Sequence, residues 1–108
     1  LKPLIDIPRL ADLAQNMIRL SLDSFIKKDA NCGPKVHEME KESDKLMDLI
    51  TDELMQIMIK DCTIIPKAIP LLLIGRHLER ICDHAMNIAE DVVYMVEAKV
   101  VKHLHLEK

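Results

Sequence analysis

The chain has 108 residues, enough for one domain with a hydrophobic core of its own. Hydrophobic residues make up 49% of it and charged residues 31%, a balance typical of a folded, helical protein and not of a disordered one. The net charge is −3 and only Phe25 and Tyr94 are aromatic, which excludes the basic field and the stacking surfaces of a nucleic-acid-binding protein.

Signals for membranes and for secretion are also missing from the sequence. No apolar run approaches the roughly 20 residues that span a bilayer, and no secretory signal opens the chain. The three cysteines are widely spaced and form no Cys-x-x-Cys pair, which is typical of reduced intracellular thiols. We therefore expect a cytoplasmic protein with no direct membrane insertion and no nucleic-acid partner.

The first predicted helix covers residues 7–28. Pro3 and Pro8 stand where a helix can begin but not continue, and the apolar positions that follow repeat with a period of 3.6 residues. These positions are Leu10, Leu13, Ala14, Met17, Ile18, Leu22, Phe25 and Ile26. A cluster of helix breakers then predicts a turn at residues 29–34.

Two longer helices are predicted at residues 34–59 and 64–100. The second helix is expected to bury Val36, Met39, Leu46, Leu49, Ile50, Leu54, Ile57 and Met58. The third is expected to bury Leu71, Ile74, Leu78, Ile81, Ala85, Ile88, Val92 and Val96. Thr63 is predicted as its N-cap. Pro70 lies too deep for a first turn, so the third helix should either begin late or kink there.

Three long helices joined by short turns predict an all-α fold, an antiparallel three-helix bundle. The sequence contains no linker, low-complexity tract or internal repeat, so residues 1–108 are expected to form one domain. We assign no chemistry to residues 103–108, which we interpret as a tail or as vector-derived sequence.

Pairs of acidic residues four apart occur on both longer helices. Glu79 and Asp83 stack one turn from each other, away from the apolar stripe, and Glu40 and Asp44 repeat the spacing. Without a cation such a pair mildly destabilises a helix, whereas both carboxylates can offer oxygen ligands to one bound metal ion. A merely solvated acidic face is the alternative interpretation of this spacing. The same helix faces also carry His37, Asp48 and Glu90.

Two stretches of the sequence resemble the PhoU family of bacterial phosphate-signalling proteins. Residues 78–90, Leu-Glu-Arg-Ile-Cys-Asp-His-Ala-Met-Asn-Ile-Ala-Glu, are similar to the family's final-helix signature, with Cys82 in place of the usual glycine. Residues 2–15 resemble the start of one of its repeats. The family usually carries two three-helix repeats in tandem, and this chain resembles the C-terminal one. Because the surface facing a sister repeat would be exposed, we expect a homo-oligomer, for which a dimer is the simplest form.

The resemblance implies metal binding at Glu/Asp-x-x-x-Asp motifs on the repeat surface. It points to Glu79, Asp83, Glu40 and Asp44 as metal ligands, with His37, Asp48 and Glu90 as secondary candidates. Iron, zinc, manganese, magnesium and calcium are the metals considered, and the sequence does not choose among them. His77 and His84 are better explained as histidines at the edge of the core. Cys82 is interpreted as a small core residue, with a soft metal ligand as the alternative.

No catalytic arrangement is evident, since the sequence has no Gly-rich phosphate cradle, no nucleophile motif and no Glu-x-x-His pair. The resemblance instead implies a non-catalytic cytoplasmic regulator, peripheral at the inner membrane through its partners. Such a protein couples a phosphate ABC transporter to a sensor histidine kinase and keeps phosphate-starvation genes off when phosphate is plentiful. The alternatives are the regulatory domain of a sodium/phosphate cotransporter and a metal-free helical module that binds only protein.

Overall fold

The computed structural model describes the backbone of residues 3–106 and the side chains of residues 6–99. This part of the chain forms α1 (Pro3–Lys27), α2 (Cys32–Lys60), a short 3₁₀ helix η1 (Cys62–Ile64) and α3 (Ile65–Leu106). There is no strand among the described residues. The predicted all-α, three-helix bundle is confirmed.

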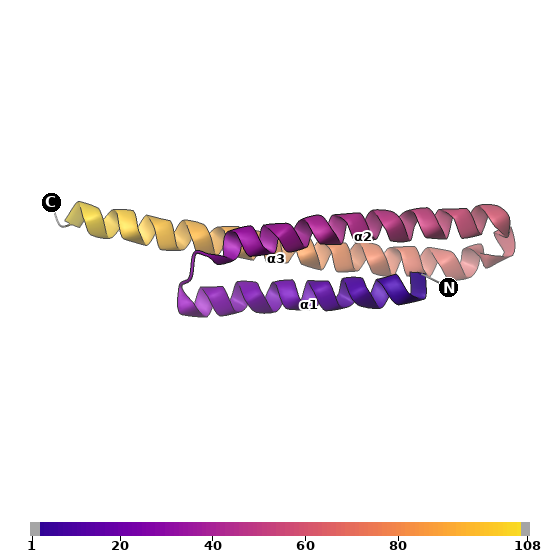
Figure 1. Cartoon of the computed structure of the whole chain (residues 1–108), viewed down its shortest axis with the longest axis horizontal. Coiled ribbons are helices and arrows are strands. Elements are labelled where there is room, and N and C mark those ends of the chain that lie inside the picture. The colour runs from indigo at the N-terminus through magenta and orange to yellow at the C-terminus, as the bar shows by residue number, and fades with distance from the viewer. Residues whose placement is uncertain (1–2, 107–108) are drawn as a thin grey trace.

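The helices lie side by side in an elongated bundle that measures 70 × 17 × 17 Å (Figure 1). α1 and α3 run in the same direction and α2 runs antiparallel to both (Figure 1). Their lengths are 25, 29 and 42 residues for α1, α2 and α3. Because α3 is so much longer, its C-terminal end continues past the α1–α2 turn as a single projecting helix (Figure 1).

The helix limits differ from the sequence prediction mainly near prolines. α1 spans 3–27 instead of 7–28 and runs through Pro8, whereas α2 spans 32–60 instead of 34–59 and holds Pro34 in its first turn, where a proline is tolerated. α3 begins at residue 65 and runs through Pro70, so the late start considered for this helix is wrong. It also continues to residue 106, beyond the predicted end at 100.

Both turns are closed by local hydrogen bonds. At the end of α1, Lys28 adopts a left-handed conformation (φ 55°), and the Asp29 amide donates to the Ser24 carbonyl at 3.0 Å, which forms a Schellman cap. After α2, the Asp61 carboxylate accepts from the Thr63 amide at 3.0 Å and from the Thr63 hydroxyl at 2.6 Å. Asp61 is therefore the capping residue, and the prediction of Thr63 as the N-cap of the third helix is wrong.

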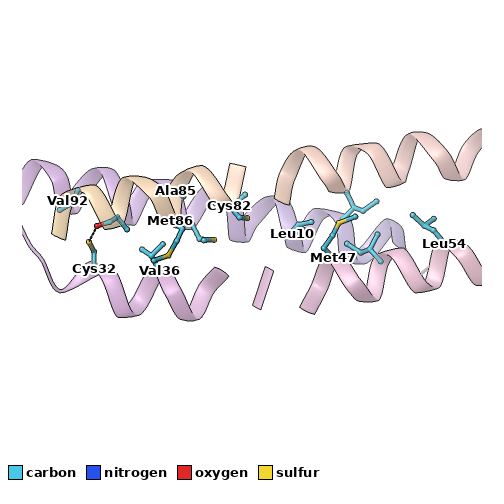
Figure 2. Close-up of a cluster of buried hydrophobic side chains, with 14 of the residues drawn as sticks. Leu10, Cys32, Val36, Met47, Leu54, Cys82, Ala85, Met86 and Val92 are labelled. Carbon is cyan, nitrogen blue, oxygen red and sulfur yellow. Dashed lines mark hydrogen bonds between the residues drawn. The ribbon is translucent and has the colours of Figure 1, made fainter. Parts of the chain in front are cut away.

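The centre of the bundle is lined by small residues of α3 that repeat every seven positions. We call Ala68, Gly75, Cys82 and Ala89 the small seam; all four are buried. Figure 2 shows Cys82 and its neighbours Ala85 and Met86 among the core side chains. At Gly75, an added Cβ would lie 3.0 Å from the Met47 sulfur of α2, so the helices approach closely there. Cys82, which stands in place of the glycine usual in the PhoU signature, is fully buried in the same row.

Several apolar residues that were predicted to be buried are exposed instead. On α1 these are Leu22, Phe25 and Ile26; on α2, Leu49; and on α3, Ile74 and Ile81. Small side chains occupy the central positions, including the serines Ser21, Ser24 and Ser43. Because the helices pack closely on these small residues, larger neighbours are displaced to the flanks. The period of the apolar pattern was predicted correctly, and most of the residues predicted to be buried are buried or pack against the core, so the prediction is wrong only at these exposed positions.

Candidate metal centre between helices α2 and α3

The two predicted acidic pairs face each other across the contact between α2 and α3. Antiparallel packing brings Glu40 of α2 next to Asp83 of α3, and their carboxyl groups hydrogen-bond to each other. Asp44 lies within electrostatic range of both Glu40 and Glu79. The structure thus brings together four residues that were predicted as two separate pairs.

The electrostatics of Glu40 show how strongly these carboxylates interact. Its pKa is raised from 4.5 to about 7, first by burial, then by the hydrogen bond and the negative charge of Asp83, and further by Asp44 and Glu90. At neutral pH the Glu40 side chain is therefore protonated part of the time. A bound cation could take the place of that proton between the two carboxylates.

Glu79 occupies a similar position one turn before Asp83. Burial and the negative charges of Asp44, Asp83 and Asp48 raise its pKa, while Arg76 partly offsets them. Of the secondary candidates, Asp48 and Glu90 thus belong to the same acidic surface. His37 is exposed on α2 and is not among the groups that shift the pKa of Glu40.

Two buried side chains, Ser43 and Cys82, lie beneath this acidic surface. The Ser43 hydroxyl, which is fully buried, donates to the Glu40 carbonyl at 2.7 Å and so satisfies its own hydrogen bond within α2. Cys82 lies behind Asp83, and burial raises the pKa of its thiol to about 11. A thiol that stays protonated at neutral pH is a poor metal ligand, which favours its interpretation as a core residue.

The side chains as placed do not form a finished metal site. In the described part of the chain, no three His, Cys, Asp or Glu side chains make a group that could hold a metal ion. The residues form a bipartite acidic surface in which only Glu40 and Glu79 are partly buried, while Asp44, Asp48, Asp83 and Glu90 are exposed. Exposed carboxylates on helices can change rotamer at small cost.

The residues of this surface could be predicted from the sequence, but their partners across the bundle could not. The pairing of Glu40 with Asp83 depends on the register of α2 against α3, and no sequence motif predicts that register. Ser43 had been assigned no role, although its position between Glu40 and Asp44 was a signal that α2 turns this side toward α3. None of the helices among the described residues has a stretch long and apolar enough to traverse a membrane.

Fold and surface together define the class of protein: a three-helix bundle with paired carboxylates across the contact between two of its helices. The profile of the PhoU domain matches residues 7–92, which include all the acidic residues of this surface. The chain belongs to the PhoU family.

Relatives of known designation agree with this assignment. A phosphate-specific transport system accessory protein PhoU homolog from Aquifex aeolicus is 36% identical over 108 residues, covering 100% of this chain and 49% of that protein. Homolog 2 from Thermotoga maritima is 34% identical over 107 residues (99% and 46%). The homolog from Pseudomonas putida is 33% identical over 104 residues (96% and 41%). The chain thus spans slightly less than half the length of these relatives.

Proposed function

We propose that this chain is a non-catalytic regulator of phosphate uptake and phosphate-starvation signalling. The proposal is supported by its membership of the PhoU family and by the relatives, which are designated accessory proteins of the phosphate-specific transport system. In this role it would couple a phosphate ABC transporter to a sensor histidine kinase in the cytoplasm. Contact with the membrane would be made through the transporter, and signalling would be repressed while phosphate is plentiful.

The acidic surface between α2 and α3 is proposed to bind metal, with Glu40, Asp44, Glu79 and Asp83 as ligands and Asp48 and Glu90 as outer contributors. The observation that carries this proposal is the Glu40–Asp83 contact, where two carboxylates from different helices are held together against their repulsion. Oxygen ligands of this kind suit iron, manganese, magnesium, calcium or zinc. A surface metal could then bridge to a phosphate or to a carboxylate of a partner, which this acidic surface would otherwise repel.

Metal content of the purified chain, measured by elemental mass spectrometry, tests this proposal. We expect metal in a fixed ratio to protein and its loss in the double variant Glu40→Ala/Asp44→Ala, with helicity unchanged by circular dichroism. The matched control is Glu38→Ala/Glu42→Ala, because these residues have the same spacing on the opposite, exposed side of α2.

Either of two results would contradict the metal site. One is a metal-free protein that cannot be reconstituted, and the other is equal metal retention in both double variants. The chain would then be a helical module whose carboxylates only keep it soluble. The regulatory role is tested separately, by asking whether the chain binds the ATPase subunit of a phosphate transporter in a pull-down of purified proteins.

A further inference from the structure

The flank of the bundle where α2 meets α3 changes character along its length. Toward the α1–α2 turn it carries the acidic surface, whereas toward the α2–α3 turn it carries large apolar side chains. We call these the hairpin face: Met55, Ile59, Ile65, Ile69 and Leu73, all of which are exposed. Ile59 is 74% exposed and Leu73 53%. Apolar residues scattered singly over a surface are common, but a group of this kind typically marks an interaction site.

The register of the two helices brings the residues of the hairpin face together. α2 and α3 are antiparallel and are joined by the short helix η1 (Figure 1). A Cβ added at Gly75 of α3 would lie 3.0 Å from the Met47 sulfur of α2, so these two positions are level. Counting from this level toward the turn places Met55 close to Ile69. The other three residues lie one helical turn from this pair along their own helices, so the five form one patch.

The hairpin face lies on the same flank as the acidic surface. On α3, Ile69, Asp83 and Glu90 share one helix face, because they are separated by multiples of seven residues. On α2, Met55 follows Asp48 at an interval of seven. The two surfaces therefore form one continuous strip, which we call the α2/α3 strip, apolar at one end and acidic at the other.

The acidic end of the strip has an excess of negative charge. It contains six carboxylates, those of Glu40, Asp44, Asp48, Glu79, Asp83 and Glu90. Arg76 partly offsets this charge at Glu79. Such a surface attracts lysine and arginine side chains and repels anions, including the phosphate headgroups of lipids. A molecule complementary to the whole strip is therefore apolar at one end and basic at the other.

We propose that the α2/α3 strip is the docking site for a helix of another protein, with apolar side chains at one end and lysine or arginine side chains at the other. Two antiparallel helices can seat a further helix along their line of contact, as in a four-helix bundle. From Ile65 to Asp83 the strip is about 27 Å long, so a helix of about 18 residues would cover it. The hairpin face supplies the apolar contact, and the carboxylates select a basic partner and fix its direction.

The docking site goes beyond the proposed function and needs no bound metal. Its probe is a fluorescein-labelled helical peptide of about 18 residues, with leucines on one face of its first half and lysines on the same face of its second half. In EDTA, we expect fluorescence polarisation to show saturable binding that weakens about fivefold or more when the salt concentration is raised about tenfold. The same peptide with glutamates in place of the lysines should bind about tenfold or more weakly.

Paired substitutions test whether the peptide lies on the hairpin face. Ile69→Gln/Leu73→Gln removes two apolar contacts without changing the charge, and it should raise the dissociation constant about tenfold or more. The matched control is Leu22→Gln/Ile26→Gln, a pair of exposed apolar residues with the same spacing on α1, which should bind the peptide like the natural chain. Glutamine is a strong helix former, so both variants should keep their helicity in circular dichroism.

The acidic end of the strip is tested in the same assay. Asp48→Asn/Glu79→Gln should weaken binding of the lysine peptide and reduce its dependence on salt, because fewer charges take part. Glu38→Gln/Glu42→Gln, on the opposite side of α2, is the control and should leave both unchanged.

The proposal is overturned if the peptide shows no saturable binding, if the lysine and glutamate peptides bind equally, or if the Ile69/Leu73 variant binds like the natural chain. A lower mass in solution for that variant than for the natural chain would overturn it in favour of a second copy as the occupant. Binding of the natural chain to phosphatidylglycerol vesicles, lost in the same variant, would overturn it in favour of a membrane. A failed metal test leaves these outcomes unchanged, since peptide binding is measured in EDTA.

Discussion

The two flanks of α3, which contact α1 and α2, differ in the charge of the side chains at the helix contact. On the flank toward α1, the contact is neutral, and the Ser21 hydroxyl donates to the Ala85 carbonyl of α3 at 2.9 Å. On the flank toward α2, the centre of the contact is closely packed, since Gly75 lies against Met47, but its outer edge is lined with carboxylates that repel one another. One helix thus combines a neutral contact with a contact that carries mutually repelling charges at its edge.

The largest loss of stability is expected from a substitution in the small seam. Cys82→Leu adds volume to a position with no exposed surface, so it should lower the free energy of unfolding by about 1–3 kcal/mol in urea denaturation. Cys62→Leu is the control, because Cys62 is exposed in η1 and its replacement should change stability by no more than about 0.5 kcal/mol. Equal effects of the two substitutions would show that close packing at the seam is unimportant.

A smaller effect is expected from the bridge between α1 and α3. Ser21→Ala removes the hydroxyl that reaches the Ala85 carbonyl and should destabilise the chain by about 0.5–1.5 kcal/mol. Thr51→Ala is a suitable comparison, since the Thr51 hydroxyl bonds only to Met47 within its own helix, at 2.8 Å. Thermal unfolding of both variants measures the difference. If the Ser21 variant is as stable as the natural chain, the hydrogen bond to Ala85 does not contribute to the stability of the contact between α1 and α3.

The smallest effect concerns the acidic flank and depends on pH. The pKa of Glu40 is raised to about 7, so its neutral form is favoured in the folded chain. The stabilisation linked to this group is fully present below its ordinary pKa of 4.5 and is lost as the pH rises through 7. In EDTA, Glu40→Gln should therefore be more stable than the natural chain at pH 8, by up to about 1 kcal/mol after allowance for solvent screening.

The same substitution should have little effect at pH 4, where the natural side chain is already neutral. Chemical denaturation across this pH range measures the difference. Glu42→Gln, on the other side of α2, should leave the pH profile unchanged. A Glu40 variant whose profile matches that of the natural chain would mean that the carboxylates of the acidic surface do not interact appreciably.

The existence and order of the three helices could be predicted because apolar periodicity and breaker residues are local signals. Most of the residues that each helix buries could be predicted as well, among them Leu10, Ile50 and Val92, but the exposure of some large apolar residues could not. Hydropathy ranks Ile74 and Ile81 above alanine, glycine and serine, yet the bundle centre is built on Gly75, Cys82 and Ser21 because short side chains allow close approach. Burial depends on the distance between the helices, and that distance cannot be derived from the sequence of one helix alone.

The residues of the candidate site could also be predicted, but their arrangement across helices could not. Spacing of four residues is sufficient to find each acidic pair within its helix, and the family motif singled out Glu79 and Asp83. The contact between Glu40 and Asp83 depends instead on how far α2 slides along α3. That register is set by the capped turn at Asp61 and by the fit of Met47 against Gly75, which are properties of the folded chain.

The length of α3 creates a gradient of local stability along one continuous helix. Up to about Val96, which still packs against the core, its amides are protected by neighbouring helices, whereas the last residues to Leu106 project beyond both of them (Figure 1). A helical segment of fewer than about a dozen residues is marginal by itself in water. Amide hydrogen exchange should therefore be slow through the bundle and faster by orders of magnitude toward the tip. Slowed exchange at that tip would report directly that another molecule had come to lie against it.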